Sequence, residues 1–238
     1  GDGDRDFVAG SERSGGRTPV VWYDNDGNEN FFERELPLTV DGTVDAGDVL
    51  DVAAVDVDND GFPDIVTTER GVNKTDPKVA WYQNDGTPVD GGWTQNIISR
   101  TTQPPSEIQA ADVEGDGDVD LLAVSGRTGA DRVQWYRNDG SASFSTRLLS
   151  AGPGNAQDVY ATDLNADDHT DFLTASQGGN RIAWYENDGQ SRFTSHVITL
   201  APRDNFPSSD VSVTAADLDG DDDRDVVWAN PNGGKVAW

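Results

Sequence analysis

The sequence contains no cysteine, so disulfide bonds cannot stabilise this chain. Only 34% of its 238 residues are hydrophobic, which favours several small cores over one deep core. Apolar runs are short, such as LLAV at 121–124, and no segment has the length of a membrane span or the pattern of a signal peptide. These absences exclude a disulfide-stapled fold and membrane insertion.

Positive charge is scarce as well, because 17 Lys and Arg face 44 Asp and Glu, for a net charge of −27. This charge excludes nucleic acid as a partner, since the phosphates would be repelled. It fits cation binding, a high-salt habitat or disorder, and the seven tryptophans argue against disorder. Asp outnumbers Glu by 36 to 8, which indicates a positional role for aspartate beyond solubility.

The aspartates are concentrated in nine-residue segments, here called Asp loops, with acids at alternate positions. The full copies are DVDNDGFPD at 56–64, DVEGDGDVD at 112–120, DLNADDHTD at 163–171 and DLDGDDDRD at 217–225, and a shortened GDGDRD opens the chain at 1–6. Carboxylates this close repel one another unless a cation neutralises them, and hard oxygen ligands around a tight turn suit calcium. The loops therefore predict calcium sites.

A second motif recurs in step with the Asp loops. Its copies are VVWYDNDG at 20–27, VAWYQNDG at 79–86, VQWYRNDG at 133–140 and IAWYENDG at 182–189, and VAW ends the chain at 236–238. A spacing of about 50 residues is typical of repeat arrays and propellers. We interpret the tryptophans as packing between repeats, with sugar stacking as the alternative.

Each repeat is predicted to contain four short strands, A to D, which in one complete copy are 157–164, 171–176, 181–187 and 193–200. The Asp loop joins A to B, and the Asn-Asp-Gly turn joins C to D. No window shows a helical period. We predict an all-β chain, a β-propeller of four-stranded antiparallel blades in one domain or propeller fragment, with three complete and two partial blades. The blades span approximately residues 1–48, 49–106, 107–156, 157–209 and 210–238.

The D-x-D-x-D-G-x-x-D loops, repeated at blade spacing, resemble the FG-GAP or VCBS repeats of integrin α-subunit propellers and of many bacterial and archaeal surface proteins. Some fungal lectins share this fold. The resemblance implies calcium held between strands A and B, at about four sites in this chain. It also implies a secreted protein that is extracellular or on the cell surface.

The candidate ligands follow from the 56–64 loop. There Asp56, Asp58 and Asp60 offer side chains, Phe62 offers its carbonyl and Asp64 closes the shell, while Gly61 permits the sharp turn. The other loops supply Asp112, Glu114, Asp116, Asp118 and Asp120; Asp163, Asn165, Asp167, His169 and Asp171; Asp217, Asp219, Asp221, Asp223 and Asp225; and Asp2, Asp4 and Asp6.

The copies are not equivalent. The loops at 56–64, 112–120 and 217–225 are predicted to bind calcium best, and 163–171 less well because Asn165 is neutral and Asp168 replaces the glycine. Asp168 is expected to adopt a left-handed conformation at some energetic cost. The loop at 1–6 is predicted to be the poorest site because it lacks the first and third ligands.

Strand polarity places the Asp loops and Asn-Asp-Gly turns at one end of each blade, and the B–C and D–A connections at the other. The acidic excess belongs to the metal end, whereas the other end is charge-balanced and varies in length, so we predict partner binding there. Arg70, Arg127 and Arg181 are the candidate contacts for a glycan or surface protein. Unpaired strand edges of the partial blades also predict self-assembly or completion by another chain.

Catalytic groups are scarce. The only histidines are His169, in an Asp loop, and His196, in a predicted strand, and no Ser-His-Asp grouping or phosphate-binding glycine loop occurs. We therefore predict a binding module without catalytic residues. The alternatives are a structural subunit of a surface layer or filament that assembles through blade edges and, less favoured, a polysaccharide-active enzyme.

Overall fold

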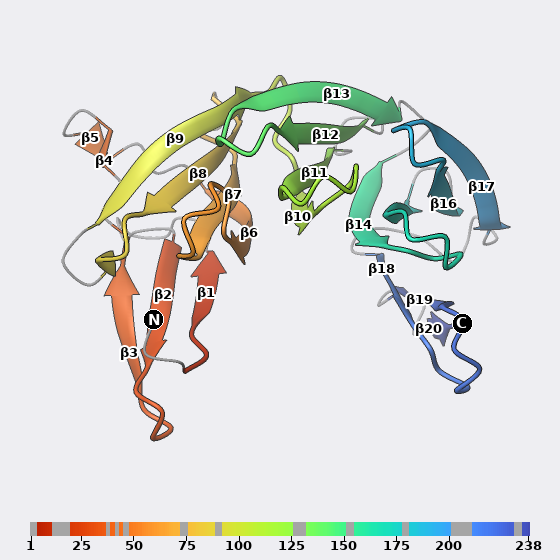
Figure 1. Ribbon diagram of the computed structural model, residues 1–238, viewed down its shortest axis with the longest axis horizontal. Helices are drawn as coiled ribbons and strands as arrows, with labels where there is room; N and C mark the ends of the chain where they lie inside the picture. Colours follow the sequence, from red (N-terminus) through yellow and green to blue (C-terminus); the bar gives the residue numbers. More distant parts are fainter. Residues whose placement is uncertain are drawn as a thin grey trace. The chain divides into compact units, whose positions relative to one another are not determined.

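The regular structure of this chain consists of β-strands (Figure 1). The computed structural model describes residues 4–10, 20–36, 39–40, 43–44, 48–71, 76–88, 92–125, 132–150, 155–177, 181–200, 211–230 and 235–238. Across these described segments no α-helix is found. The predicted all-β class is therefore confirmed.

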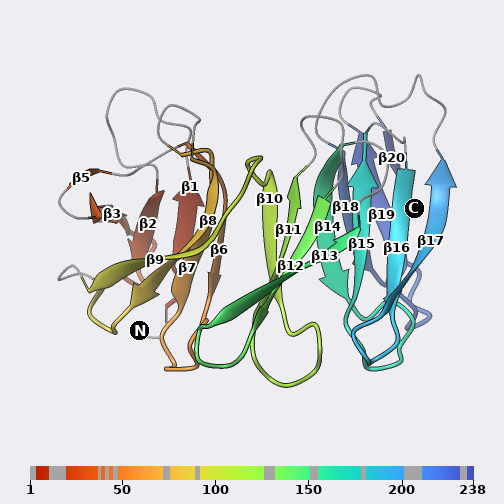
Figure 2. The same ribbon diagram turned by 90° about the horizontal axis from the view of Figure 1, so that it is seen from above.

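The strands form antiparallel sheets in which neighbours in the chain are neighbours in space (Figure 2). Sheet I contains β1 (Phe7–Gly10), β2 (Val20–Asn25) and β3 (Phe31–Glu35). Sheet II contains β6 (Val49–Val55), β7 (Asp64–Glu69), β8 (Lys78–Asn84) and β9 (Trp93–Arg100). Sheet III contains β10 (Glu107–Ala111), β11 (Asp120–Ser125), β12 (Arg132–Asn138) and β13 (Phe144–Ser150). Sheet IV contains β14 (Ala156–Thr162), β15 (Asp171–Ser176), β16 (Arg181–Asn187) and β17 (Phe193–Leu200). Sheet V contains β18 (Ser212–Ala216), β19 (Asp225–Asn230) and β20 (Lys235–Ala237), and β4 (Thr39–Val40) pairs with β5 (Thr43–Val44).

Sheets II, III and IV each contain the four predicted strands A to D in that order. Among the described residues, sheet I has strands B to D and sheet V has strands A to C, as predicted. The sheets are thus those of a propeller-like repeat fold, whereas the single domain, the blade number and the closure of a ring stay predictions.

Contacts divide the chain into two compact units. The first consists of residues 1–108 with 140–143 and holds sheets I and II, and the second consists of 109–139 with 144–238. Sheets IV and V and most of sheet III lie in the second unit.

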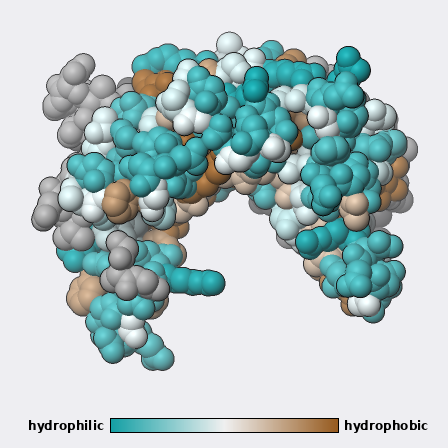
Figure 3. Space-filling view, viewed as in Figure 1, coloured by the Kyte–Doolittle hydropathy of each residue, from teal (hydrophilic) through white to brown (hydrophobic). Residues whose placement is uncertain are grey.

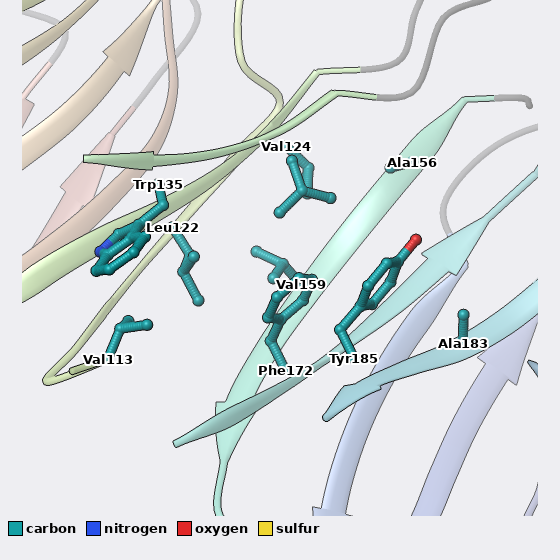
Figure 4. Close-up of a cluster of buried hydrophobic side chains, with 10 residues drawn as sticks. Val113, Leu122, Val124, Trp135, Ala156, Val159, Phe172, Ala183 and Tyr185 are labelled. Atoms are coloured by element: carbon teal, nitrogen blue, oxygen red, sulfur yellow. The ribbon is translucent and has the colours of Figure 1, made fainter. Parts of the chain in front are cut away.

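Each unit has its own apolar core, built where one sheet faces the next. In the second unit Trp135 of sheet III lies in one cluster with Val159, Phe172 and Tyr185 of sheet IV (Figure 4). Trp22 of sheet I packs in the same way with Ile65 and other residues of sheet II in the first unit. The predicted packing role of these tryptophans is confirmed.

The alternation of side chains along strand C explains this arrangement. Trp135 and Tyr136 are adjacent, so they point to opposite faces of sheet III, and both are buried. Each large aromatic ring brings substantial apolar area to a core that has few hydrophobic residues. The view in Figure 3 accordingly shows a surface dominated by hydrophilic residues.

Candidate metal centre

Each full Asp loop connects the first two strands of its sheet, and its first aspartate orders the turn. Asp56 Oδ1 accepts a hydrogen bond from the Asp60 amide (3.2 Å), and Oδ2 accepts one from the Gly61 amide (2.9 Å). The first aspartates of the other full loops, Asp112, Asp163 and Asp217, accept backbone hydrogen bonds in the same manner. The loop conformation is therefore held by the chain's own hydrogen bonds.

Two residues in each full loop have left-handed backbone conformations. At the sixth position φ is 91° for Gly61 and Gly117, 66° for Asp168 and 70° for Asp222, which confirms the expectation for Asp168. The fourth position is left-handed too, a feature that we did not predict; its residues are Asn59, Gly115, Ala166 and Gly220. These two reversals curl the chain so that side chains at alternate positions face inward.

The curled loop at 56–64 brings three predicted ligands together. Asp56, Asp58 and Asp60 each offer a carboxylate oxygen, and these oxygens lie within 4.8 Å of one another. Calcium binds oxygens at about 2.3–2.6 Å, so two oxygens on one ion are separated by at most about 5 Å. The arrangement thus fits a calcium ion.

A second such group lies in the last loop, where Asp217, Asp219 and Asp225 converge. Within the described segments the loops at 112–120 and 163–171 and residues 4–6 contain no group of this kind. Asp2 lies outside the described residues. Two of the three loops that we ranked highest therefore have the geometry of a metal site.

The aspartate at the ninth position has a structural role in addition to its predicted metal role. Asp64 is 0% exposed, its Oδ2 accepts a hydrogen bond from the Val57 amide (3.0 Å), and its Oδ1 accepts one from the Asn84 amide (2.8 Å). Asp120 and Asp171 repeat both contacts. Each carboxylate oxygen keeps a second lone pair, so these hydrogen bonds are compatible with metal ligation.

Burial controls the protonation of these ninth-position aspartates. It raises the pKa of both Asp64 and Asp120 to about 6, while hydrogen bonds from backbone amides oppose the rise. The pKa of Asp171 is raised for the same reason. A cation close to the carboxylate would lower these pKa values, because it favours the charged form.

The asparagine of each Asn-Asp-Gly turn, which we predicted only as a turn residue, also contacts the Asp loop. Asn84 donates from its amide to Asp64, donates from Nδ2 to the Pro63 carbonyl (3.0 Å), and accepts at Oδ1 from the Gly86 amide (3.0 Å). Asn25, Asn138 and Asn187 make corresponding contacts. The recurrence of Asn at this position in four copies was the available signal.

The turn also contacts the seventh position of the Asp loop. A Cβ on Gly86 would lie 2.7 Å from the Phe62 ring, and Gly86 has a φ of 82°. Glycine is therefore required at this turn both for its conformation and for the space that Phe62 fills. In sheet IV, His169 and Gly189 have the same relationship.

In sheets II and III the residue before this asparagine lies beside the third position of the Asp loop. Gln83 Nε2 donates to Asp58 Oδ2 (2.6 Å), whereas Arg137 forms ion pairs with Glu114 and Asp116. This neighbour is neutral in sheet II and positive in sheet III. This contact cannot be predicted from the local sequence, because it depends on the register of strand C.

The predicted partner-binding arginines have intramolecular partners where they are described. Arg70 pairs with Asp48 (3.7 Å) with only 12% of its side chain exposed, and Arg181 Nη2 donates to the Tyr185 hydroxyl (3.2 Å). Arg127 lies outside the described residues. Neither described arginine presents an isolated charge to a partner.

Lys78, at the start of β8, also has a partner within the chain. Its side chain is fully buried, with Nζ 3.3 Å from Glu69 Oε2. Glu69 Oε1 accepts hydrogen bonds from Thr67 and Tyr82, both at 2.9 Å. Burial raises the pKa of Glu69, and the charge of Lys78 opposes that rise.

Comparison with known proteins links these repeats to a family. A family model described as FG-GAP-like repeat matches residues 1–67, 56–123, 112–174 and 163–228. A search of curated protein sequences finds no match. The described residues contain no helix long and apolar enough to cross a membrane.

Two solved structures that match this chain do so over nearly all of its length. A protein from Lactobacillus plantarum has a TM-score of 0.59 at 10% identity, over 98% of this chain and 65% of that one. The biofilm matrix protein Bap1 of V. cholerae has a TM-score of 0.48 at 18% identity, over 98% of this chain and 38% of that one. This chain thus spans less than two thirds of the length of either protein.

Proposed function

Because the chain belongs to the FG-GAP-like repeat family, we propose that it is a calcium-stabilised extracellular module for recognition or adhesion. The observation that carries the proposal is the convergence of the Asp56, Asp58 and Asp60 carboxylates within 4.8 Å. Three like charges at this separation repel one another, and a divalent cation converts the repulsion into attraction.

Calcium has a structural role in this proposal. The loop that would hold the ion is tied through Asp64 to Asn84, so its order is coupled to the packing of sheet II. Ligands that bind only the folded state add to the free energy of unfolding. The ions thereby stabilise a chain in which hydrophobic residues are few.

The partner in this proposal is a glycan or a surface protein, bound at the ends of the sheets opposite the Asp loops. Strong acidity at the loop end suits a metal scaffold and disfavours acidic partners there. The partner-binding end consists of the segments between strands B and C and between strands D and A. Recognition by connecting segments on a rigid scaffold is a common arrangement.

Two experiments test the proposal: calcium titration calorimetry on the metal-free protein, and a glycan array with and without chelator. We expect uptake of calcium by the metal-free protein and loss of that uptake at the 56–64 loop in Asp58→Asn. Glycan binding that disappears in chelator and returns with calcium would support recognition. Absence of calcium binding at millimolar calcium would contradict the structural role of the metal. An array on which no glycan binds would contradict the proposal that the partner is a glycan.

A second candidate function, assembly into a surface layer or filament, is favoured by an aromatic cluster on sheet I. Phe7 stacks on Tyr23 (4.6 Å between ring centroids) and lies 5.2 Å from Phe31, and both phenylalanines are 49% exposed. The corresponding rings in sheet IV are Phe172, Tyr185 and Phe193, with centroid distances of 4.5 and 5.2 Å.

The buried cluster indicates what the exposed one would bind. Phe172 is only 1% exposed because sheet III, with Trp135, covers it. A tryptophan-bearing FG-GAP sheet of a second copy has the matching chemistry for sheet I. Sedimentation velocity should then show association that increases with concentration and that Phe7→Ser weakens. A monomer at all concentrations would argue against assembly through this face.

A further inference from the structure

Arg137 lies in the 112–120 Asp loop where a bound cation would be expected. Its Nε donates to Glu114 Oε1, and its Nη2 lies 3.9 Å from Asp116 Oδ2. Glu114 and Asp116 occupy the third and fifth positions, which are ligand positions in the 56–64 loop. The Glu114 side chain is only 10% exposed, so the contact with Arg137 is shielded from water on the carboxylate side.

The corresponding positions of the other sheets make this contact specific to sheet III. Gln83 in sheet II is a neutral donor to Asp58, and Asp56, Asp58 and Asp60 converge as a metal site would require. In sheet IV the residue is Glu186, which pairs with His196 (2.7 Å) instead of with the loop. Arginine therefore faces a full Asp loop only in sheet III, among the described strands.

The carboxylates of the 112–120 loop are arranged differently from those of the 56–64 loop. Although the loop has acids at the first, third, fifth, seventh and ninth positions, no three of them converge on one point in the described structure. Glu114 is instead directed to the guanidinium. The acid content of the loop alone would have predicted the opposite.

We propose that the Arg137 guanidinium replaces the metal ion in the 112–120 loop, so that a cation of the chain itself offsets part of the negative charge of this loop and the loop binds calcium weakly or not at all. The inference deepens the proposed function, on which it rests, by assigning calcium to the loops at 56–64 and 217–225. Between sheets II and III, the residue before the Asn-Asp-Gly turn then distinguishes an Asp loop that takes a metal ion from one that does not.

Electrostatics gives the physical reason. A guanidinium is always charged and matches the geometry of carboxylates, so it offsets one of the two negative charges of Glu114 and Asp116 without any exchange with solvent. A calcium ion entering beside it would place two charges close to a third of the same sign. Repulsion between a divalent and a monovalent cation about 5 Å apart lowers affinity by about tenfold or more, even at the dielectric constant of water.

The test exchanges the two residues between sheets. Calcium titration calorimetry is performed on the wild-type protein, Arg137→Gln, Gln83→Arg and Arg132→Gln. Arg132 is the matched control because it is an exposed arginine at the opposite end of the same strand. We expect one additional ion in Arg137→Gln, at least about tenfold weaker binding at the 56–64 loop in Gln83→Arg, and no change in Arg132→Gln.

A second substitution locates the additional ion. Adding Asp116→Asn to Arg137→Gln should abolish it, whereas Asp116→Asn in the wild-type background should leave the number of bound ions unchanged. If Asp116→Asn alone removes an ion from the wild-type protein, the 112–120 loop already binds calcium and the inference is overturned. An unchanged ion count in Arg137→Gln would overturn it as well.

Thermal unfolding in chelator tests the inference without metal. Arg137→Gln should lower the melting temperature more than Arg132→Gln does, and adding Glu114→Gln should restore part of the loss, because a neutral side chain needs no counter-ion. A wild-type protein that binds no calcium would refute the proposed function, and the chelator experiment would still decide on Arg137. Equal melting temperatures of the two arginine variants in chelator would refute its role as counter-ion.

Discussion

The amide of Asn84 donates a hydrogen bond of 2.8 Å to Oδ1 of Asp64, and these residues belong to two different repeated motifs. Asp64 ends the Asp loop, and Asn84 begins the Asn-Asp-Gly turn. Since Asp64 Oδ2 also accepts from the Val57 amide, one buried carboxylate connects the start of the loop, its end and the neighbouring turn. The conformation of the Asp loop and the packing of the sheet are thereby linked.

Removal of calcium should destabilise the folded chain. Excess chelator leaves the carboxylates of Asp56, Asp58 and Asp60 without a counter-ion, so we expect the melting temperature to fall by several degrees or more. Differential scanning calorimetry in calcium and in chelator measures the shift, with magnesium as the control for ionic strength. Coincident curves in calcium and chelator would contradict the structural role of the ion.

Loss of a ligand should cost more than loss of a turn residue. Asp60→Ala removes a proposed ligand and also the acceptor of the Phe62 amide hydrogen bond (2.8 Å), whereas Asp168 is not a predicted ligand. At a fixed calcium concentration we expect Asp60→Ala to lower the free energy of unfolding by about 2 kcal/mol and Asp168→Ala by less. Urea unfolding midpoints compare the two, and equal losses would count against the ligand assignment.

Glycine should stabilise the 163–171 loop. Asp168 (φ 66°) and Ala166 (φ 59°) hold left-handed conformations that glycine adopts without steric cost. Asp168→Gly and Ala166→Gly should each raise the free energy of unfolding by about 0.5–1 kcal/mol. Thr170→Gly, at a position without a left-handed conformation, is the control and should lower the free energy of unfolding. If Asp168→Gly and Ala166→Gly both lower the free energy of unfolding, the left-handed conformations of these two residues are not strained.

Asn187 should contribute more to stability than Asn84 does. Its Nδ2 donates to the Thr170 carbonyl (3.1 Å) and also to the Val113 carbonyl of the neighbouring 112–120 Asp loop (2.8 Å), whereas Asn84 Nδ2 donates to Pro63. Asn187→Ala leaves buried acceptors unpaired and should cost about 2–4 kcal/mol, and Asn84→Ala should cost less. Chemical denaturation measures both, and the reverse order would refute the contribution of the contact between sheets.

The buried ninth-position aspartates should make the metal-free protein less stable as the pH rises. Burial raises the pKa of Asp120 from the usual 3.8 to about 6, so between these values the folded state binds more protons than the unfolded state. The free energy of unfolding therefore falls as the pH rises from about 4 to about 6. For a fully buried carboxyl group we expect the free energy of unfolding to fall by about 1–3 kcal/mol over this pH range.

Unfolding in urea at several pH values, in chelator, measures this dependence. Asp120→Asn cannot titrate, so it should reduce the slope between pH 4 and 6 whatever its effect on overall stability. The remaining slope reports the general repulsion of a chain with a net charge of −27. Equal slopes for the wild-type protein and Asp120→Asn would contradict the raised pKa.

Much of the local structure was determined by the sequence itself. The strands, the Asn-Asp-Gly hairpins and the left-handed sixth position follow from side-chain alternation and turn chemistry, which act over a few residues. Acids at alternate positions of one tight loop likewise predicted the convergence of Asp56, Asp58 and Asp60. Each of these features needs only contacts between near neighbours in the chain.

Only the tertiary structure decided which charges meet across the sheets. Arg137 reaches Glu114, Lys78 meets Glu69, and Asn187 reaches Val113, across 9 to 74 positions in the sequence. These pairs depend on strand register and on which face of a sheet a neighbour covers, and neither is encoded in a local pattern. The sequence pattern therefore predicted acidic metal loops, whereas strand pairing placed an arginine against one of them and buried a lysine against a glutamate.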